Sequence, residues 1–214
     1  MNSPGQSPES VSQAARSGPG GSPISRHPQR LDPRDLPVGF LCLAWVVLVG
    51  IGILGRLWQP VYGVSPLIGI GLCAGALFAN RFVAASVPAI ALAASNLALP
   101  GGGIYGSWTM AAIIYAAFTW PVLMGSVVRR SHVWGALGGA LAGSLVFYLS
   151  TNLAHWWLTT DYPHTASGLV ECYVAALPFY RWTPVGDLVW SLGLTSGLAF
   201  VPALARRFGV VEVA

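Results

Sequence analysis

Four long apolar stretches constrain this chain more than any other feature of its sequence. They cover residues 38–57, 83–99, 107–128 and 133–153 and hold no charged side chain except Arg56, near the end of the first. A membrane-spanning helix needs about 20 mostly apolar residues. In lipid, the backbone of such a segment must form its hydrogen bonds internally, as a helix does. The sequence therefore predicts an all-α integral membrane protein.

The composition excludes several classes of function. Charged residues make up 8% of the chain, against roughly 25% in soluble domains. All 11 of its Lys and Arg side chains are arginine. Without lysine there can be no GxxxxGK[ST] loop, in which lysine reaches the phosphates of a bound nucleotide. We expect no ATPase and no cofactor in this chain and no nucleic-acid partner, so ATP-driven work would need another subunit.

Polar and apolar segments divide the chain into three parts. Residues 1–36 are rich in Ser, Pro, Gly, Gln and Arg and nearly lack large apolar side chains. Such a segment buries too little apolar surface to offset the entropy of ordering, so we expect a disordered cytoplasmic tail. The membrane domain is expected over 37–208, and a short second cytoplasmic tail over 209–214.

The membrane domain is predicted to be a six-helix transmembrane bundle. Pro121 predicts a kink in the fourth helix. The loop 155–183, between the fifth and sixth helices, is too polar to span, but its stretch 169–180 predicts a short extra helix. Its aromatic content predicts that it folds back over the outer ends of the third and fifth helices and brings Glu171 toward Asn96; the alternative is a helix lying flat in the membrane interface. The six helices are expected at 38–57, 65–79, 82–99, 106–128, 132–154 and 185–204.

Arginine sets the expected orientation, because cytoplasmic loops carry an excess of basic residues. With the N-terminus inside, only Arg56 and Arg181 fall outside, and the other nine of the 11 fall on the cytoplasmic side. The bias is lost if one helix is added or removed. We therefore expect a multi-pass protein of the inner membrane with both termini in the cytoplasm and the loop 155–183 outside.

Glycines four residues apart mark two helix faces. They are Gly135, Gly139 and Gly143 in the fifth helix and Gly71 and Gly75 in the second. Small residues at this spacing let helix backbones approach closely. The pattern is explained either by tight packing within the chain or by a docking face for another membrane subunit.

Most polar side chains fall at the outer ends of the helices and in the loop 155–183, which favours a ligand pocket open to the outside. The alternatives are structural: tryptophan and tyrosine gather at membrane interfaces, and an amide or acid can cap a helix end. The candidate ligand-binding residues are Asn96, Trp108, Asn152, His155, Glu171, Tyr173 and Asp187.

Metal binding and catalysis have weaker support. His155, Asp161, His164 and Glu171 have suitable side chains for a metal, but their spacing matches no known motif, so we expect no metal site. No GxSxG or HExxH motif is present. An intramembrane enzyme would have to use His155 with Asp161 or Glu171 as acid and base.

Three segments carry a resemblance to a known family. They are Thr151 to Trp156, Tyr162-Pro163 with the following Gly168-Leu169, Cys172-Tyr173 and Pro178-Phe179, and Gly186-Asp187-Leu188. In these segments the chain resembles a family of uncharacterised membrane transport proteins, which are similar to the substrate-binding S component of energy-coupling-factor (ECF) vitamin transporters. Two earlier stretches, 65–81 and 88–97, are similar to the same family, and the resemblance covers about 62–200. Ser95-Asn96 in the second stretch departs from the family pattern, since we expect Ser-Asp there.

The resemblance implies an S-component-like subunit that takes up a small solute or vitamin-like molecule from the outer face. It also implies, as partners besides the lipid bilayer, an ECF-type transmembrane subunit with two ATPases inside. Two alternatives stay open. One is a non-catalytic membrane protein with an assembly or scaffolding role, and the other is the enzyme using His155.

Overall fold

Helices make up all the regular structure of the described residues, which are 36–59, 61, 63–99, 105–198 and 200–201 of this computed structural model. Asn80, Ser107 and Thr165 begin three of the helices, and each side chain accepts hydrogen bonds from backbone N–H groups of the first turn. The elements are α1 (Val38–Leu57), α2 (Leu67–Leu77), α3 (Arg81–Ala98), α4 (Trp108–Thr119), the 3₁₀ helix η2 (Trp120–Met124), α5 (Gly125–Leu158), α6 (Ala166–Tyr180) and α7 (Thr183–Leu198).

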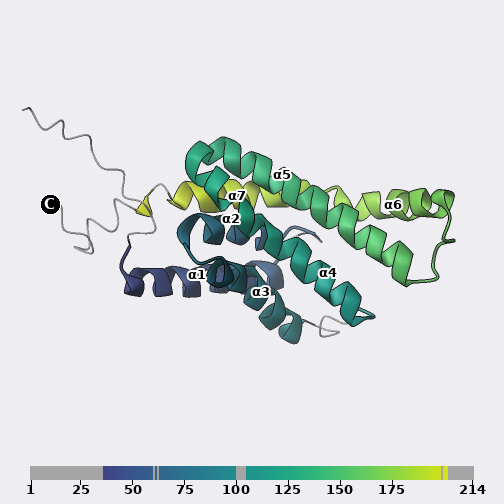
Figure 1. Ribbon diagram of the computed structural model, residues 1–214, viewed down its shortest axis with the longest axis horizontal. Coiled ribbons are helices and arrows are strands. Elements are labelled where there is room, and N and C mark those ends of the chain that lie inside the picture. The colour runs from purple at the N-terminus through teal and green to yellow at the C-terminus, as the bar shows by residue number, and fades with distance from the viewer. Residues whose placement is uncertain (1–35, 60, 62, 100–104, 199, 202–214) are drawn as a thin grey trace, which may run out of the picture. The chain divides into compact units, whose positions relative to one another are not determined.

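Helices occur at each of the predicted positions, and the extra helix expected in the loop 155–183 is α6 (Figure 1). The kink expected at Pro121 takes the form of η2, which interrupts α4 and α5. Three predictions fall on residues outside the described ranges: the disordered tail before Leu36, the tail 209–214, and the end of the sixth helix beyond Val201.

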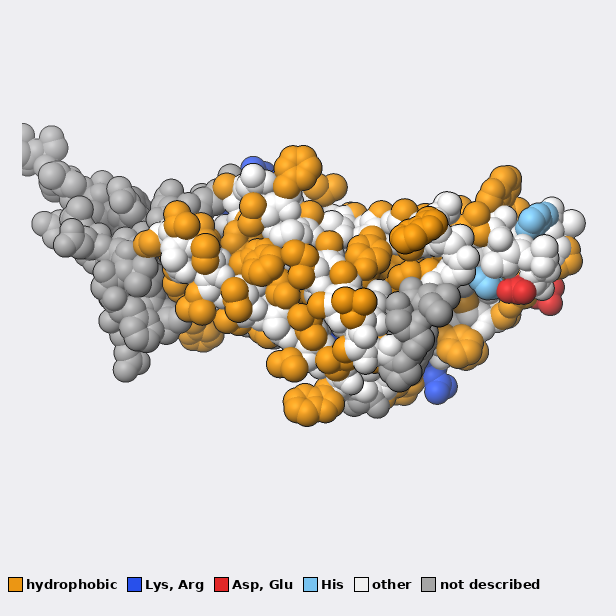
Figure 2. Space-filling model, turned by 90° about the horizontal axis from the view of Figure 1, so that it is seen from below, with side chains coloured by type: hydrophobic (Ala, Val, Ile, Leu, Met, Phe, Trp, Pro, Cys, Tyr) orange, Lys and Arg blue, Asp and Glu red, His pale blue; other side chains and the backbone are white. Residues whose placement is uncertain are grey.

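Three helical stretches are long and apolar enough to cross a membrane, which indicates a membrane protein. They are Val38–Leu57, Arg81–Ala98 and Trp108–Leu158. Figure 2 shows apolar side chains over much of the visible surface, while acidic and histidine side chains gather at one end. The helix predicted over 65–79 is shorter than expected, since α2 has 11 residues. At 1.5 Å per residue that is about 16 Å, roughly half the hydrocarbon thickness of a bilayer.

The 51-residue stretch Trp108–Leu158 is not one straight rod, because it breaks at His132. The backbone there has φ 41° and ψ −105°, outside the helical range. A Cβ built on Gly135 would lie 2.7 Å from the Val127 carbonyl oxygen. Eight residues along a straight helix are about 12 Å apart, so the chain folds back at His132. This break separates the fourth and fifth helices, as the sequence predicts.

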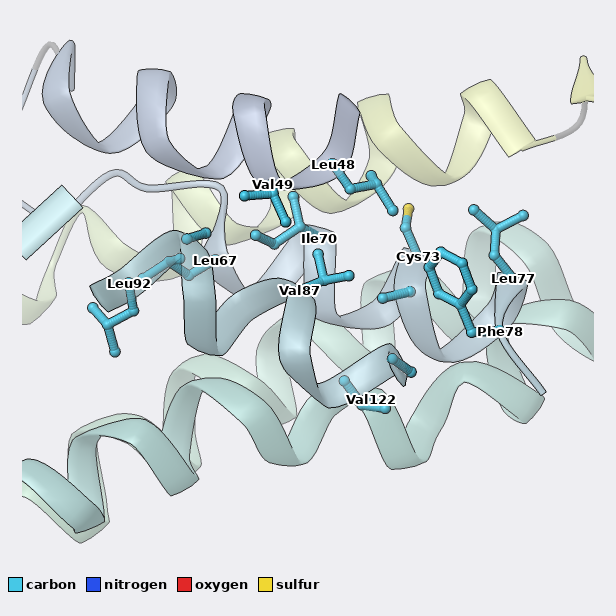
Figure 3. Packing of buried hydrophobic residues seen from close by; sticks show 13 residues of the cluster. Leu48, Val49, Leu67, Ile70, Cys73, Leu77, Phe78, Val87, Leu92 and Val122 are labelled. Carbon is cyan, nitrogen blue, oxygen red and sulfur yellow. The ribbon is translucent and has the colours of Figure 1, made fainter. Parts of the chain in front are cut away.

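The core of the bundle is α2, whose 11 residues are all buried. It packs against α1, α3, α4, η2, α5 and α7. Figure 3 shows Ile70 and Cys73 of α2 among apolar side chains of the neighbouring elements, including Val49 of α1 and Val87 of α3. A helix buried on every side needs no polar face, which explains why the 65–79 region is uniformly apolar.

Both glycine faces are covered inside the molecule, each by other residues. A Cβ on Gly139 would lie 2.7 Å from Leu72, and one on Gly143 would lie 2.7 Å from Ile68. Gly75 packs against the backbone of Val122 and Gly125, where a Cβ would clash with main-chain atoms. The glycine patterns are therefore explained by packing of α2 against η2 and α5, and this face is not free to dock another subunit.

Two arginine side chains donate hydrogen bonds to carbonyl groups at the C-terminal end of α2. Arg81 Nη1 donates to the carbonyl oxygens of Gly75 and Val122 at 3.2 and 3.0 Å, and Arg129 Nη1 donates to those of Gly75 and Ala76 at 3.4 and 3.1 Å. The last carbonyls of a helix lack partners within the helix and carry a partial negative charge. These side chains are therefore structural as well as basic, and they hold α2, α3, η2 and α5 together.

Candidate functional site

A cavity of about 520 Å³ opens among α1, α2, α4, α5, α6 and α7. Pockets for small ligands generally measure about 300–1,000 Å³ and are mostly apolar with a few polar groups. Its wall is contributed by the C-terminal ends of α1 and α6, the N-terminal ends of α2 and α7, Tyr105 before α4, and the second half of α5. These are the helix ends that the arginine distribution predicts to lie outside.

Aromatic rings form much of the cavity wall. Tyr148 and Tyr180 stack with ring centroids 4.3 Å apart, and Phe118 and Phe147 lie 4.5 Å apart. Tyr148 is fixed from behind, because its hydroxyl donates to the Tyr173 carbonyl oxygen at 2.6 Å. This part of the wall is therefore aromatic, and the hydrogen bond from Tyr148 to Tyr173 holds it in place.

Two side chains of opposite charge also line the cavity. Asp187 of α7 is 2% exposed, and its Oδ2 has no hydrogen-bond partner. Arg56 of α1 is partly buried, and its Nη1 likewise has none. These two residues do not form an ion pair with each other. A polar atom left unpaired away from water costs free energy, so both groups are candidates for contact with a ligand.

A serine links Asp187 to the aromatic wall. Ser144 of α5 is fully buried beside the Asp187 carboxyl group, and its hydroxyl lies 3.2 Å from the Tyr180 hydroxyl. Asp187 lies in the second turn of α7, because that helix begins at Thr183. It is therefore too far along the helix to cap the N-terminus, which was the structural explanation for an acid at this position.

Of the predicted site residues, Asn152 and Asp187 line the cavity. The Asn152 amide nitrogen donates to the Tyr148 carbonyl oxygen at 2.8 Å, which leaves the amide oxygen available as an acceptor. Asn96 lies behind the wall, where its amide nitrogen donates to the hydroxyl of the cavity residue Tyr105. Tyr173 does not line the cavity either, but its carbonyl oxygen accepts the hydrogen bond from the cavity residue Tyr148.

The other three predicted residues lie away from the cavity wall. Trp108 is 92% exposed, and Glu171 is exposed on α6. His155 pairs with Asp161, with Nε2 3.1 Å from Oδ2, at the turn between α5 and α6. That distance suits an acid–base pair, but neither residue lines the cavity. Among the described residues, no three His, Cys, Asp or Glu side chains group closely enough to hold a metal ion.

Several cavity residues escaped the sequence prediction, chiefly Arg56, Tyr148 and Tyr180. A signal for Arg56 was present, because it is the one charge within the four apolar stretches, and ionised groups at membrane depth often mark functional sites. Tyr148 gave no such signal, since a tyrosine inside an apolar helix is chemically unremarkable until its neighbours are known.

Comparison with known proteins places the chain in a family without assigning it an activity. No curated protein and no solved structure matches it. One family model matches residues 37–210, which include the whole membrane domain predicted from the sequence. The chain therefore belongs to the family described as "Family of unknown function (DUF6580)".

Proposed function

We propose that this chain is the solute-binding subunit of a membrane uptake system, similar in role to the S component of ECF transporters. The observation that carries the proposal is the cavity of about 520 Å³, which is lined by Arg56 and Asp187, each with a buried polar atom that has no hydrogen-bond partner. A cavity without a ligand-binding role would be expected to close or to pair these atoms, because buried polar groups without partners are unfavourable.

The proposed arrangement has six membrane crossings in the inner membrane, with both termini in the cytoplasm and the cavity facing outward. Exposed aromatic side chains support two interfacial belts. Trp58 and Trp108 lie at the cavity end, and Phe82 and Trp134 lie near the arginines at the opposite end. The short, enclosed α2 crosses with the help of its neighbours rather than facing lipid itself.

The energy for uptake has to come from partners in this proposal. The chain has no lysine and no phosphate-binding loop, so hydrolysis of ATP would fall to separate ATPases joined through a transmembrane subunit. Because the glycine faces of α2 and α5 are already occupied within the chain, that subunit would dock on another surface.

The orientation is tested by labelling single cysteines in intact cells. Cys42 is the exposed native cysteine, while Cys73 and Cys172 are buried, so Cys42→Ser gives an unreactive parent. His164 and Ser131 are both exposed and lie just beyond α5 and beside its break, respectively. An impermeant thiol reagent should label His164→Cys and spare Ser131→Cys until the cells are opened. The reverse pattern would show that the cavity faces the cytoplasm.

Ligand retention tests the function itself. Ala176 lines the cavity from α6, and the adjacent Ala175 is exposed and does not line it. Ala176→Trp should fill the cavity and reduce the co-purifying small molecule at least tenfold, as measured by mass spectrometry of the denatured, detergent-purified protein. Ala175→Trp adds the same bulk to the same helix and should retain the molecule as the native chain does.

Two results would contradict the binding proposal. One is the absence of any retained small molecule in the native chain, which would favour the assembly role instead. The other is equal retention by Ala176→Trp and Ala175→Trp, which would place the molecule elsewhere. Retention near the exposed pair His155–Asp161 would revive the enzyme alternative.

A further inference from the structure

The cavity is lined by two ionisable groups, one basic and one acidic, that do not pair with each other. Arg56 lies on α1 and Asp187 on α7, and each contributes a buried atom without a hydrogen-bond partner. Ser144 provides Asp187 with one polar neighbour, but none of the arginines that the structure describes approaches it closely enough for an ion pair. A protein that only needed to neutralise these groups could pair them directly, as buried charges usually are.

A ligand that carries both charges would satisfy both groups at once. A guanidinium binds carboxylate through paired, charge-assisted hydrogen bonds, and a carboxylate accepts strong hydrogen bonds from an ammonium group. A ligand with an anionic group alone would leave Asp187 unpaired, and an amine alone would leave Arg56 unpaired. Charge complementarity on both sides thus selects against ligands with a single charge.

The other cavity-lining side chains determine which kind of ligand body fits beside Arg56 and Asp187. Phe118, Phe147, Tyr148 and Tyr180 line the cavity, which favours an apolar or aromatic body over a strongly hydrated one. Resting on the proposed function, we infer that the ligand is a small zwitterion. Its anionic group binds Arg56, its ammonium group binds Asp187, and its apolar or aromatic body lies against the aromatic side chains of the wall.

A matched set of four compounds tests the charge pattern: phenylalanine, phenethylamine, 3-phenylpropionate and 2-phenylethanol. They share a phenyl ring and carry, in that order, both charges, the ammonium alone, the carboxylate alone and neither. Binding to the full chain in detergent is measured as the ligand concentration that gives a half-maximal rise in Tm. The native chain should bind phenylalanine at least tenfold more tightly than each of the other three.

Two substitutions assign the two ends of the ligand. Arg56→Gln should remove the preference for phenylalanine over phenethylamine, and Asp187→Asn should remove the preference for phenylalanine over 3-phenylpropionate. The Tm without ligand reports whether each variant is folded. Arg56 is only partly buried, so Arg56→Gln should fold and tests the assignment even if Asp187→Asn does not fold.

Equal binding of a singly charged or neutral compound, or no binding of phenylalanine, would overturn the zwitterion assignment. So would a preference that survives Arg56→Gln unchanged. These failures are distinct from failure of the proposed function, which is decided by retention in Ala176→Trp. If a molecule is retained but carries a single charge or none, the binding role stands and the zwitterion assignment falls.

Discussion

Gly125→Ala is expected to prevent this chain from folding normally. A Cβ at position 125 would lie 1.9 Å from the backbone carbon of Gly75, and the nearby atoms are main-chain atoms that no rotamer change can move. Overpacking of side chains usually costs about 1–3 kcal/mol. A clash between two backbones should cost more, so we expect a loss of more than about 3 kcal/mol in the free energy of unfolding.

The matched control is Gly138→Ala on the same helix. Gly138 is exposed, and a Cβ there would meet no atom within 4 Å. Alanine favours helix over glycine by roughly 0.5–1 kcal/mol, so this variant should be as stable as the native chain or slightly more stable. Unfolding by SDS in mixed micelles, followed by circular dichroism, measures both. Equal stability of the two variants would mean that Gly75 and Gly125 do not touch.

Much of the fold could be predicted from the sequence because lipid imposes simple rules on a chain. A charge-free run such as 83–99 has few alternatives to a helix, and Pro121 and the polar loop 155–183 mark where helices are interrupted. The spacing of Gly135, Gly139 and Gly143 predicts close helix contact. It does not reveal the partner, because pairing depends on residues far away in sequence, here Leu72 and Ile68.

The candidate site could be predicted only in part. Asn152 and Asp187 stand out because a polar group at membrane depth requires an explanation. Trp108 and Glu171 also stand out by type, but only the geometry shows that the Trp108 side chain is 92% exposed and that Glu171 lies on the outer side of α6. The cavity-lining α6 residues are Ala176, Phe179 and Tyr180 instead.

The segment 155–183 shows most clearly what could not be predicted from the sequence. Its aromatic content predicts an ordered element folded over the ends of the third and fifth helices. In the structure α6 packs chiefly along α5, with a smaller contact to α7, and its main partners do not include α3 (Figure 1). Glu171 is exposed rather than turned toward Asn96. The direction taken by a loop depends on its docking surface, which composition does not describe.

Loss of both arginines at the end of α2 should be the second most damaging change. Arg81 and Arg129 both donate to the Gly75 carbonyl oxygen, and each also donates to one further carbonyl oxygen. A buried carbonyl left without a donor costs about 1–3 kcal/mol. We expect about 1–2 kcal/mol for Arg81→Met or Arg129→Met alone, since the remaining arginine still serves Gly75.

The double variant R81M/R129M should lose more than the sum of the single losses, because Gly75 then has no donor at all. The appropriate control is R81M/R130M, which removes the same total charge from the same end of the bundle. Arg130 is exposed, so this control should lose about as much unfolding free energy as Arg81→Met alone. A larger loss in the control would reveal an effect of charge on membrane orientation. A double-mutant cycle of unfolding free energies makes the comparison. Strict additivity, or equal losses in the two double variants, would show that the arginines anchor the chain by charge and do not complete α2.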